Sequence, residues 1–238
     1  MQINGFFWQW GGSIWDESKA PISKALGVVN SDQNVEAFET YLKLLTHAPP
    51  AYKTGQMDIF QIQELFMQGK VASIFDWVAL AEATLDPNIS KVADKVAFSM
   101  TPGRKVDGKI TRWSNVGGQP FVLTTWNDEE VVKESLELVK WWLSPTVQIN
   151  FAKNGGQSGL RSVMTSKNYA SFRPWNRAHV ESLPWQKDVW HVPEFFEMLT
   201  QQQEQFDKAI TGQISAKEAL DSIAMYQDSV LREAGRIQ

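Results

Sequence analysis

The chain has 238 residues, of which 43% are hydrophobic and 21% are charged, and it carries a formal net charge of -4 at pH 7. This is the composition of a globular protein with enough apolar material for one large domain or two lobes, so it excludes a disordered chain. The acidic balance, without a local cluster of Lys and Arg, excludes nucleic acid as a partner, and the absence of cysteine excludes disulfides, thiol nucleophiles and thiolate metal sites.

No segment of the sequence is apolar enough to predict a membrane span. The runs at 71–75 and 121–123 are far shorter than the roughly 20 residues that cross a bilayer. The first residues do not have the charged and apolar regions of a signal peptide. Tryptophan is unusually frequent, with eleven residues, which is typical of large cores or of surfaces that stack on flat ligands with polar edges.

The N-terminal part of the sequence predicts an extended aromatic segment and then two capped helices. Trp8 and Trp10 alternate with a polar residue, so in an extended segment they would point to the same side. Ser31 precedes apolar residues at helical spacing and predicts the start of a helix. Asp58 and Gln61 have the spacing of a capping box and predict a second helix that ends at a glycine.

The middle of the sequence predicts short strands and further helices. Buried strands are expected at 71–75, 96–100 and 119–125, and turn signals predict a hairpin over 101–116. Asn127 and Glu130 have the spacing of another capping box. The helix that they begin is expected to bury one stripe, made of Val132, Leu136, Val139 and Leu143. A shorter helix is predicted over 145–153.

The C-terminal part of the sequence predicts two helices. Pro193 is expected as the first residue of a helix that ends at Gly212, and Ser215 with Glu218 predicts the capping box of the last helix. Short buried strands that alternate with helices predict an α/β architecture. No Gly/Ser-rich or Pro-rich linker marks a domain boundary, as expected of two lobes that are joined by more than one crossing of the chain.

Five segments resemble one known family in their order along the chain. They are FFWQWGGSIWD at 6–16, ELFMQGKVASIFDW at 64–77, GGQPFVLTT at 117–125, NGGQSGLRS at 154–162 and ITGQISAKEALDSI at 210–223. The family is that of the carbohydrate-specific extracellular solute-binding proteins of ABC importers, which includes the maltose-binding proteins. The five segments cover nearly the whole chain.

The resemblance implies an α/β, two-lobed fold of the periplasmic-binding-protein-like II class, with an incomplete N-terminal lobe in this chain. It assigns 1–112 to the first part of the C-terminal lobe, 113–189 to a returning part of the N-terminal lobe, and 190–238 to the closing helices of the C-terminal lobe. The family's first lobe and export signal have no counterpart here, so Met1 is expected to be the start of a fragment.

The resemblance also implies a function. A protein of this family captures a sugar or oligosaccharide between its lobes by hinge closure and delivers it to the membrane permease of an ABC importer. It is not an enzyme and uses no cofactor. We therefore expect a monomer in the periplasm or outside the cell, associated with the membrane through its transporter.

The strongest candidate for a ligand contact is Trp77, where the resemblance places an aromatic residue that stacks on sugar. An indole face packs on the apolar C–H face of a pyranose, and Asp76 beside it would accept from two hydroxyls. The family often has a small residue before this tryptophan, so Asp76 is a departure. The alternative is that Asp76 caps the helix after the strand and that Trp77 belongs to the core.

Further candidates are more weakly supported. Trp10 and Trp113 would line the cleft, unless they pack in the core. Gly117 and Gly118 lie near the lobe junction, where glycines would let the backbone approach a ligand or bend. The side-chain amide of Gln119 would bind hydroxyls. The alternative is that this segment is a plain turn. Arg161 would bind vicinal hydroxyls through its planar fork, unless it is an ordinary loop arginine.

Two other functions stay open. A carbohydrate-active hydrolase also uses a Trp-lined cleft with two carboxylates, and Asp16, Asp76, Glu82 and Asp86 are available, although nothing in the sequence pairs them. The three histidines are isolated, so no metal site is expected. A non-catalytic interaction module would show a large apolar surface and no Trp-lined cleft.

Overall fold

The computed structural model describes residues 2–19, 22–54, 57–106, 108–118, 120–124 and 126–238. Its longer helices are α1 (Gln2–Gln9), α2 (Asp32–Leu44), α3 (Ile59–Met67), α5 (Glu129–Trp142), α6 (Pro145–Lys153), α10 (Phe195–Ile210) and α11 (Ala216–Glu233). Shorter ones are α4 (Ala81–Thr84), α7 (Arg161–Met164), α8 (Tyr169–Phe172) and α9 (Asn176–Ser182). The 3-10 turns are η1 (Leu45–His47), η2 (Pro50–Thr54), η3 (Val78–Leu80) and η4 (Leu183–Trp185).

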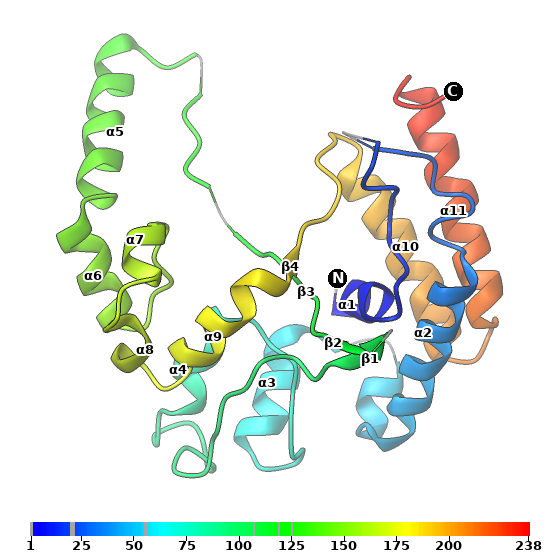
Figure 1. Cartoon of the computed structure of the whole chain (residues 1–238), viewed down its shortest axis with the longest axis horizontal. Helices are drawn as coiled ribbons and strands as arrows, with labels where there is room; N and C mark the ends of the chain where they lie inside the picture. Colours follow the sequence, from blue (N-terminus) through cyan, green and yellow to red (C-terminus); the bar gives the residue numbers. More distant parts are fainter. Residues whose placement is uncertain (1, 20–21, 55–56, 107, 119, 125) are drawn as a thin grey trace.

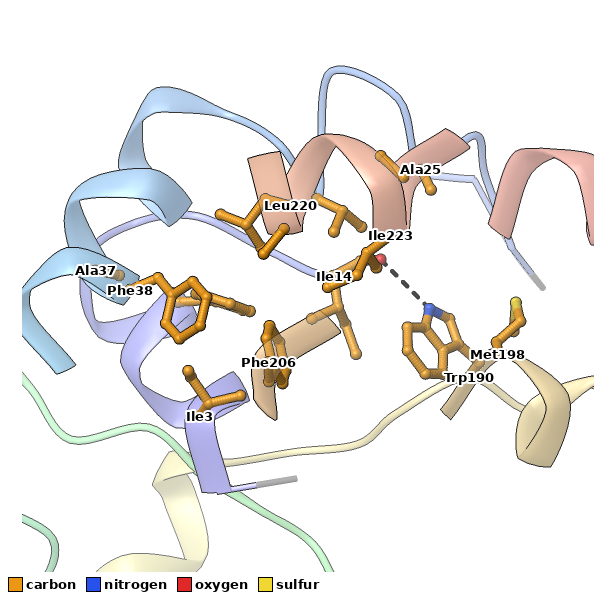
Figure 2. Close-up of a cluster of buried hydrophobic side chains, with 14 of the residues drawn as sticks. Ile3, Ile14, Ala25, Ala37, Phe38, Trp190, Met198, Phe206, Leu220 and Ile223 are labelled. Carbon is orange, nitrogen blue, oxygen red and sulfur yellow. Dashed lines mark hydrogen bonds between the residues drawn. The ribbon is translucent and has the colours of Figure 1, made fainter. Parts of the chain in front are cut away.

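Helices from the two ends of the chain form the main core. We call α1, α2, α10 and α11, with the segments that join them, the packed region; it occupies one side of the molecule in Figure 1. Phe38, Phe206 and Leu220 from three of these helices meet in its centre (Figure 2). The buried indole of Trp190 donates to the backbone oxygen of Ile14 at 3.3 Å, which joins the segment before α10 to the N-terminal segment.

The caps that the sequence predicts for this region and for α3 are confirmed. Ser31 accepts from the backbone N–H of Asn34 at 3.4 Å at the start of α2. The pairs Ser215 with Glu218 and Asp58 with Gln61 form capping boxes. α10, however, begins at Phe195, two residues after the proline that we expected to start it, because Glu194 takes the N-cap position.

Opposite the packed region, α5, α6, α7 and α8 form a second column, which we call the outer region (Figure 1). A small core joins α6 to α7 and α8 and contains Ala152, Val163 and Tyr169. The segment 116–128 leads from the centre of the molecule to α5, and its described apolar side chains are exposed or half-exposed. The helix over 145–153 is confirmed as α6.

The β-structure of the described residues is limited to two short pairs. The predicted hairpin is confirmed as β1 (Arg104–Val106) and β2 (Lys109–Thr111), which are antiparallel. Further along the chain, β3 (Ser114–Asn115) pairs in parallel with β4 (Gln186–Lys187) between the two regions.

Several predicted elements are wrong. The described parts of 71–75, 96–100 and 119–125 form no strand, because a strand needs a neighbour for its backbone groups and none of the described segments supplies one. The first segment is the helix α1 rather than extended chain, since it packs lengthwise against α2. Trp8 is therefore a core residue.

The prediction for α5 is also wrong in two respects. Its N-cap is Asp128, with no side-chain cap bond, so the expected capping box at Asn127 does not form. None of the residues of α5 is buried, and Leu136 and Leu143 of the expected buried stripe are exposed. Of the tryptophan pair at the end of the helix, Trp141 is exposed and Trp142 is half-exposed.

Candidate functional site

The candidate site lies where the segment before η3 meets β3. The Trp77 side chain is 51% exposed, so the alternative that places this residue in the core is wrong. Its indole lies against the backbone of Gly117, where a Cβ atom would be 3.9 Å from two ring atoms. Trp77 and Gly117 are forty residues apart in the sequence, and the fold brings them side by side. One half of the indole surface is therefore open to a ligand.

Asp76 is half-buried beside this tryptophan. One carboxylate oxygen, Oδ1, accepts from the backbone N–H of Trp77 at 2.8 Å. The other, Oδ2, is inaccessible to solvent and has no hydrogen-bond partner among the described residues. Burial raises the pKa of this carboxyl to about 6, although the bond from the backbone opposes the shift. The alternative role of Asp76 as a helix cap is not seen, because η3 has Trp77 at its N-cap and no side-chain cap bond.

Asn115 on β3 is a residue that the sequence did not single out. Its side-chain oxygen and nitrogen are both buried and both lack a partner among the described residues. An unpartnered buried polar group costs about 1–3 kcal/mol, so such groups call for an explanation. The single signal in the sequence was an Asn two places before a glycine pair, which is equally typical of a turn.

Helix α1 holds both segments of the site in place. The ring of Phe75, directly before Asp76, packs edge-on against Phe6 at a centroid distance of 6.5 Å. Gly5 on the same helix lies against β3, since a Cβ atom there would be 3.1 Å from the backbone oxygen of Trp113 and 3.9 Å from Cα of Ser114. The packed region thus supplies the support on which the site is built.

The other two candidate tryptophans are already in contact with protein side chains. The guanidinium of Arg104 lies 4.3 Å from the centroid of the Trp10 ring, and Phe6 stacks on that ring at 6.0 Å. The ammonium of Lys187 lies 4.7 Å from the Trp113 ring centroid. A stacking role for either ring stays a prediction, and these contacts do not favour it. The Trp10 indole N–H also donates to Glu36 at 3.1 Å.

The remaining candidates lie in different places. Gly117 and Gly118 are exposed, and neither has the positive φ that requires glycine. Gln119 lies outside the described residues. Arg161 is an exposed residue at the start of α7, in the outer region, and the structure does not bring it to Trp77. Its ligand-binding role also stays a prediction.

Three of the four carboxylates considered for a hydrolase each have a separate ion-pair or hydrogen-bond partner, and no two of them share one among the described residues. Glu82 pairs with Arg173, Asp16 accepts from the Ser18 hydroxyl at 2.6 Å, and Asp86 accepts from the Asn88 backbone N–H at 2.8 Å. The described part of the chain contains no group of three or more His, Asp or Glu residues that could hold a metal ion. Within the same residues, no helix is long and apolar enough to span a membrane.

The fold is that of known solute-binding proteins of ABC transporters. The chain is similar to the ribitol-bound solute-binding protein of Agrobacterium radiobacter K84, with a TM-score of 0.76 and 22% identity over 96% of this chain and 55% of that one. It is similar to maltose-bound MalE3 of T. maritima, with a TM-score of 0.80 and 19% identity over 96% and 56% of the two chains. A mannitol-bound protein from Agrobacterium vitis S4 matches at a TM-score of 0.69 and 19% identity, over 98% and 58%.

These similarities confirm the predicted fold class, a two-lobed binding-protein fold of which this chain has an incomplete part. The chain spans little more than half the length of the solved structures that it matches. Those structures are transport binding proteins and not enzymes. No sequence family and no curated protein matches the chain.

Proposed function

We propose that this chain is the greater part of a solute-binding protein that captures a sugar or related polyol between two lobes and delivers it to an ABC permease. The observation that carries the proposal is the half-exposed indole of Trp77 beside the partly buried carboxylate of Asp76. It is supported by a fold that recurs in proteins crystallised with ribitol, maltose and mannitol. The place of action is then the periplasm or the outer face of the membrane.

The chemistry of the two side chains suits a neutral carbohydrate. A flat apolar indole face accepts the C–H face of a sugar ring, and a carboxylate accepts hydrogen bonds from the hydroxyls at its rim. The backbone at Gly117 carries no side chain that would cover the indole. Such pairing of one stacking surface with a few polar groups is the usual composition of small-molecule sites.

In the proposed division into lobes, residues 1–112 and 190–238 belong to one lobe and residues 113–189 belong to the other. The main core supports it, because its buried residues come from the two ends of the chain. Several contacts cross the proposed boundary, however: among them, Phe98 packs edge-on against Trp175 at 5.7 Å, Glu82 pairs with Arg173, and Lys187 pairs with Glu17 at 2.8 Å. A closing motion about the junction would have to break these contacts, or pivot about them while both partners stay together.

The exposed apolar side chains of the outer region favour a second candidate function, a contact surface for other polypeptide. They include Leu138 and Trp141 of α5, and the exposed Val122 and Trp126 of the segment 116–128 lie before them in the chain. An apolar surface of this kind is what we expected of a non-catalytic interaction module. The two candidates are compatible, because a binding site at Trp77 and a contact surface on the outer region lie on different parts of the molecule (Figure 1).

Calorimetric titration with a panel of sugars and polyols tests the proposed function. We expect saturable binding of at least one member with a dissociation constant on the order of 1 mM, weak because the ligand contacts an incomplete cleft. Incubation of the same panel, with added glycosides, should give no cleavage products by chromatography. Saturable binding of nothing in the panel would refute sugar capture, and steady release of reducing ends would favour the hydrolase.

A further inference from the structure

We infer that Asn115 is a ligand-binding residue, and that with Asp76 it recognises two neighbouring hydroxyl groups of the sugar or polyol. This inference rests on the proposed function and adds to it a residue and a chemical requirement on the ligand. Its starting point is the set of three polar atoms at the site that are buried and unpartnered: Oδ2 of Asp76, and Oδ1 and Nδ2 of Asn115.

Asn115 is half-buried, and it differs from the fully buried asparagines of the described chain, Asn4, Asn34 and Asn176. Each of those makes at least one side-chain hydrogen bond, although Oδ1 of Asn34 and of Asn176 is also unpartnered. The amide nitrogen of Asn34 donates to three backbone oxygens, at 2.7 to 3.1 Å, and that of Asn176 donates to Tyr169 at 3.0 Å. These two residues have clear structural roles in fixing loops. Both amide atoms of Asn115 lack a partner among the described residues, which therefore give no structural reason for an asparagine at this position.

The unpartnered atoms lie on two segments that meet. α1 packs against both of them, through Phe6 on Phe75 and through Gly5 on β3. The Trp77 indole, one residue after Asp76, lies beside Gly117, two residues after Asn115, where an added Cβ atom would be 3.9 Å from the ring. The polar groups therefore border the same stacking surface from two directions.

Together the three atoms are complementary to a diol. A hydroxyl both donates and accepts, and the site offers two acceptor oxygens and one amide donor. A carboxylate or phosphate ligand would be repelled by Asp76, and an ammonium ligand could not accept from the amide of Asn115. The arrangement thus selects a neutral ligand with adjacent hydroxyls, and a sugar that lacks one of them should bind less well.

Access to these atoms requires a local rearrangement, and the surrounding segment permits it. The strand pairing ends at Val116, whose N–H donates to Lys187 at 2.8 Å, and the next two residues are exposed glycines. A Cβ atom on Gly118 would meet no atom within 4 Å, so this backbone has free space around it. Movement of this glycine pair would open the polar atoms without disturbing the main core.

The test is the substitution Asn115→Leu, with Asn115→Ala as a smaller variant and Asn127→Ala as the matched control on an exposed asparagine. Affinity for the best sugar or polyol of the panel, and for its monodeoxy derivatives, is measured by calorimetry, and the thermal midpoint by circular dichroism. We expect Asn115→Leu to weaken binding about tenfold or more and to remove discrimination against one deoxy derivative. The control should bind as the natural chain does.

The thermal midpoint separates this role from a structural one. Removal of an unpartnered buried amide should leave the midpoint unchanged or raise it, whereas loss of a structural hydrogen bond would lower it. Unchanged affinity in both Asn115 variants, while the natural chain binds, would overturn this inference and leave the proposed function standing. A lowered midpoint in both variants, with unchanged discrimination among deoxy sugars, would also overturn it. Absence of binding by the natural chain would refute the proposed function, and this inference with it.

Discussion

The packed region and the outer region are both built on long amphipathic helices, yet they bury them very differently. α11 has nine buried residues, whereas α5, with a comparable apolar stripe in its sequence, has none. α11 lies against α10, which directly precedes it in the sequence, and against α2, which comes from the other end of the chain. An apolar stripe becomes a core only where other elements cover it, and that is a property of the whole fold rather than of the helix.

The candidate site lies on the border between these regions. Its indole and its unpartnered polar atoms lie on segments that pack against α1 of the packed region, while the described residues between β3 and α5 are mostly exposed, with Phe121 edge-on against Trp142 at 6.2 Å. The structures that the chain resembles are nearly twice as long. We therefore propose that the exposed surface of the outer region is one that a further part of such a fold would cover.

Removal of a core side chain should give the largest difference between the regions. Leu220→Ala in α11 empties space in the main core and should lower the free energy of unfolding by about 3 kcal/mol. Leu138→Ala in α5 is the matched control, because its side chain is exposed, and should change it by less than about 0.5 kcal/mol. Urea denaturation measures both. Equal losses would show that α5 is covered in solution.

Helix capping should give the next largest difference. Ser215→Ala removes the hydroxyl that accepts from the Glu218 backbone N–H at 3.2 Å, and should cost about 1 kcal/mol in unfolding free energy. Ser144→Ala at the start of α6 removes a hydroxyl that makes no cap bond, and should cost less than half as much. If the two substitutions prove equally costly in urea denaturation, the cap assignment at α6 is wrong.

The carboxyl at the border should make stability depend on pH. The folded-state pKa of Asp76 is raised to about 6 from an ordinary value of 3.8, so its ionised form is disfavoured in the folded chain. The folded state consequently loses stability as pH rises from 4 to 6, by roughly 1 kcal/mol or less once solvent screening is allowed for.

Asp76→Asn should abolish this part of the pH dependence while leaving the rest of the profile in place. Thermal midpoints measured across the same pH range check it. Glu129→Gln, at an exposed residue of α5, is the control and should leave the profile as it is. A natural chain whose stability does not fall between pH 4 and 6 relative to Asp76→Asn would contradict the burial of this carboxyl.

Substitution of the junction glycines should have the smallest effect. Gly117→Ala adds a methyl group in ordinary contact with the Trp77 ring, and Gly118→Ala adds one in open space. Neither glycine has a positive φ, so both variants should lie within about 0.5 kcal/mol of the natural chain in urea denaturation. A loss well above that value for either would mean that the junction needs glycine for its conformation.

Local signals in the sequence predicted local structure well. The caps at Ser31, Asp58 and Ser215, and the pairing of β1 with β2, depend on residues a few places apart and formed, whereas the capping box at Asn127 did not. The strand at 71–75 and the buried stripe of α5 depended on distant partners, and neither formed. The same distinction explains the aromatic first segment, because its packing against α2 decided in favour of a helix.

The candidate site was predictable in part for the same reason. Trp77 and Asp76 were found from their place after an apolar run and from the resemblance to a known family. Asn115 was not found, because its significance lies in the absence of partners for its amide, and a sequence carries no record of which buried atoms remain unpaired. The occupation of the Trp10 ring by Arg104, far away in the sequence, was equally invisible.

The most direct test of the account is nuclear magnetic resonance of the indole N–H groups during titration with the best sugar or polyol of the panel. Comparison of Trp77→Phe with the natural chain assigns the Trp77 signal, and Trp126, which is 83% exposed in the segment before α5, serves as the internal control. We predict a saturable shift of the Trp77 signal and a constant signal from Trp126. A ligand that shifts Trp126 and not Trp77, or that shifts neither while it binds, would contradict the proposed site.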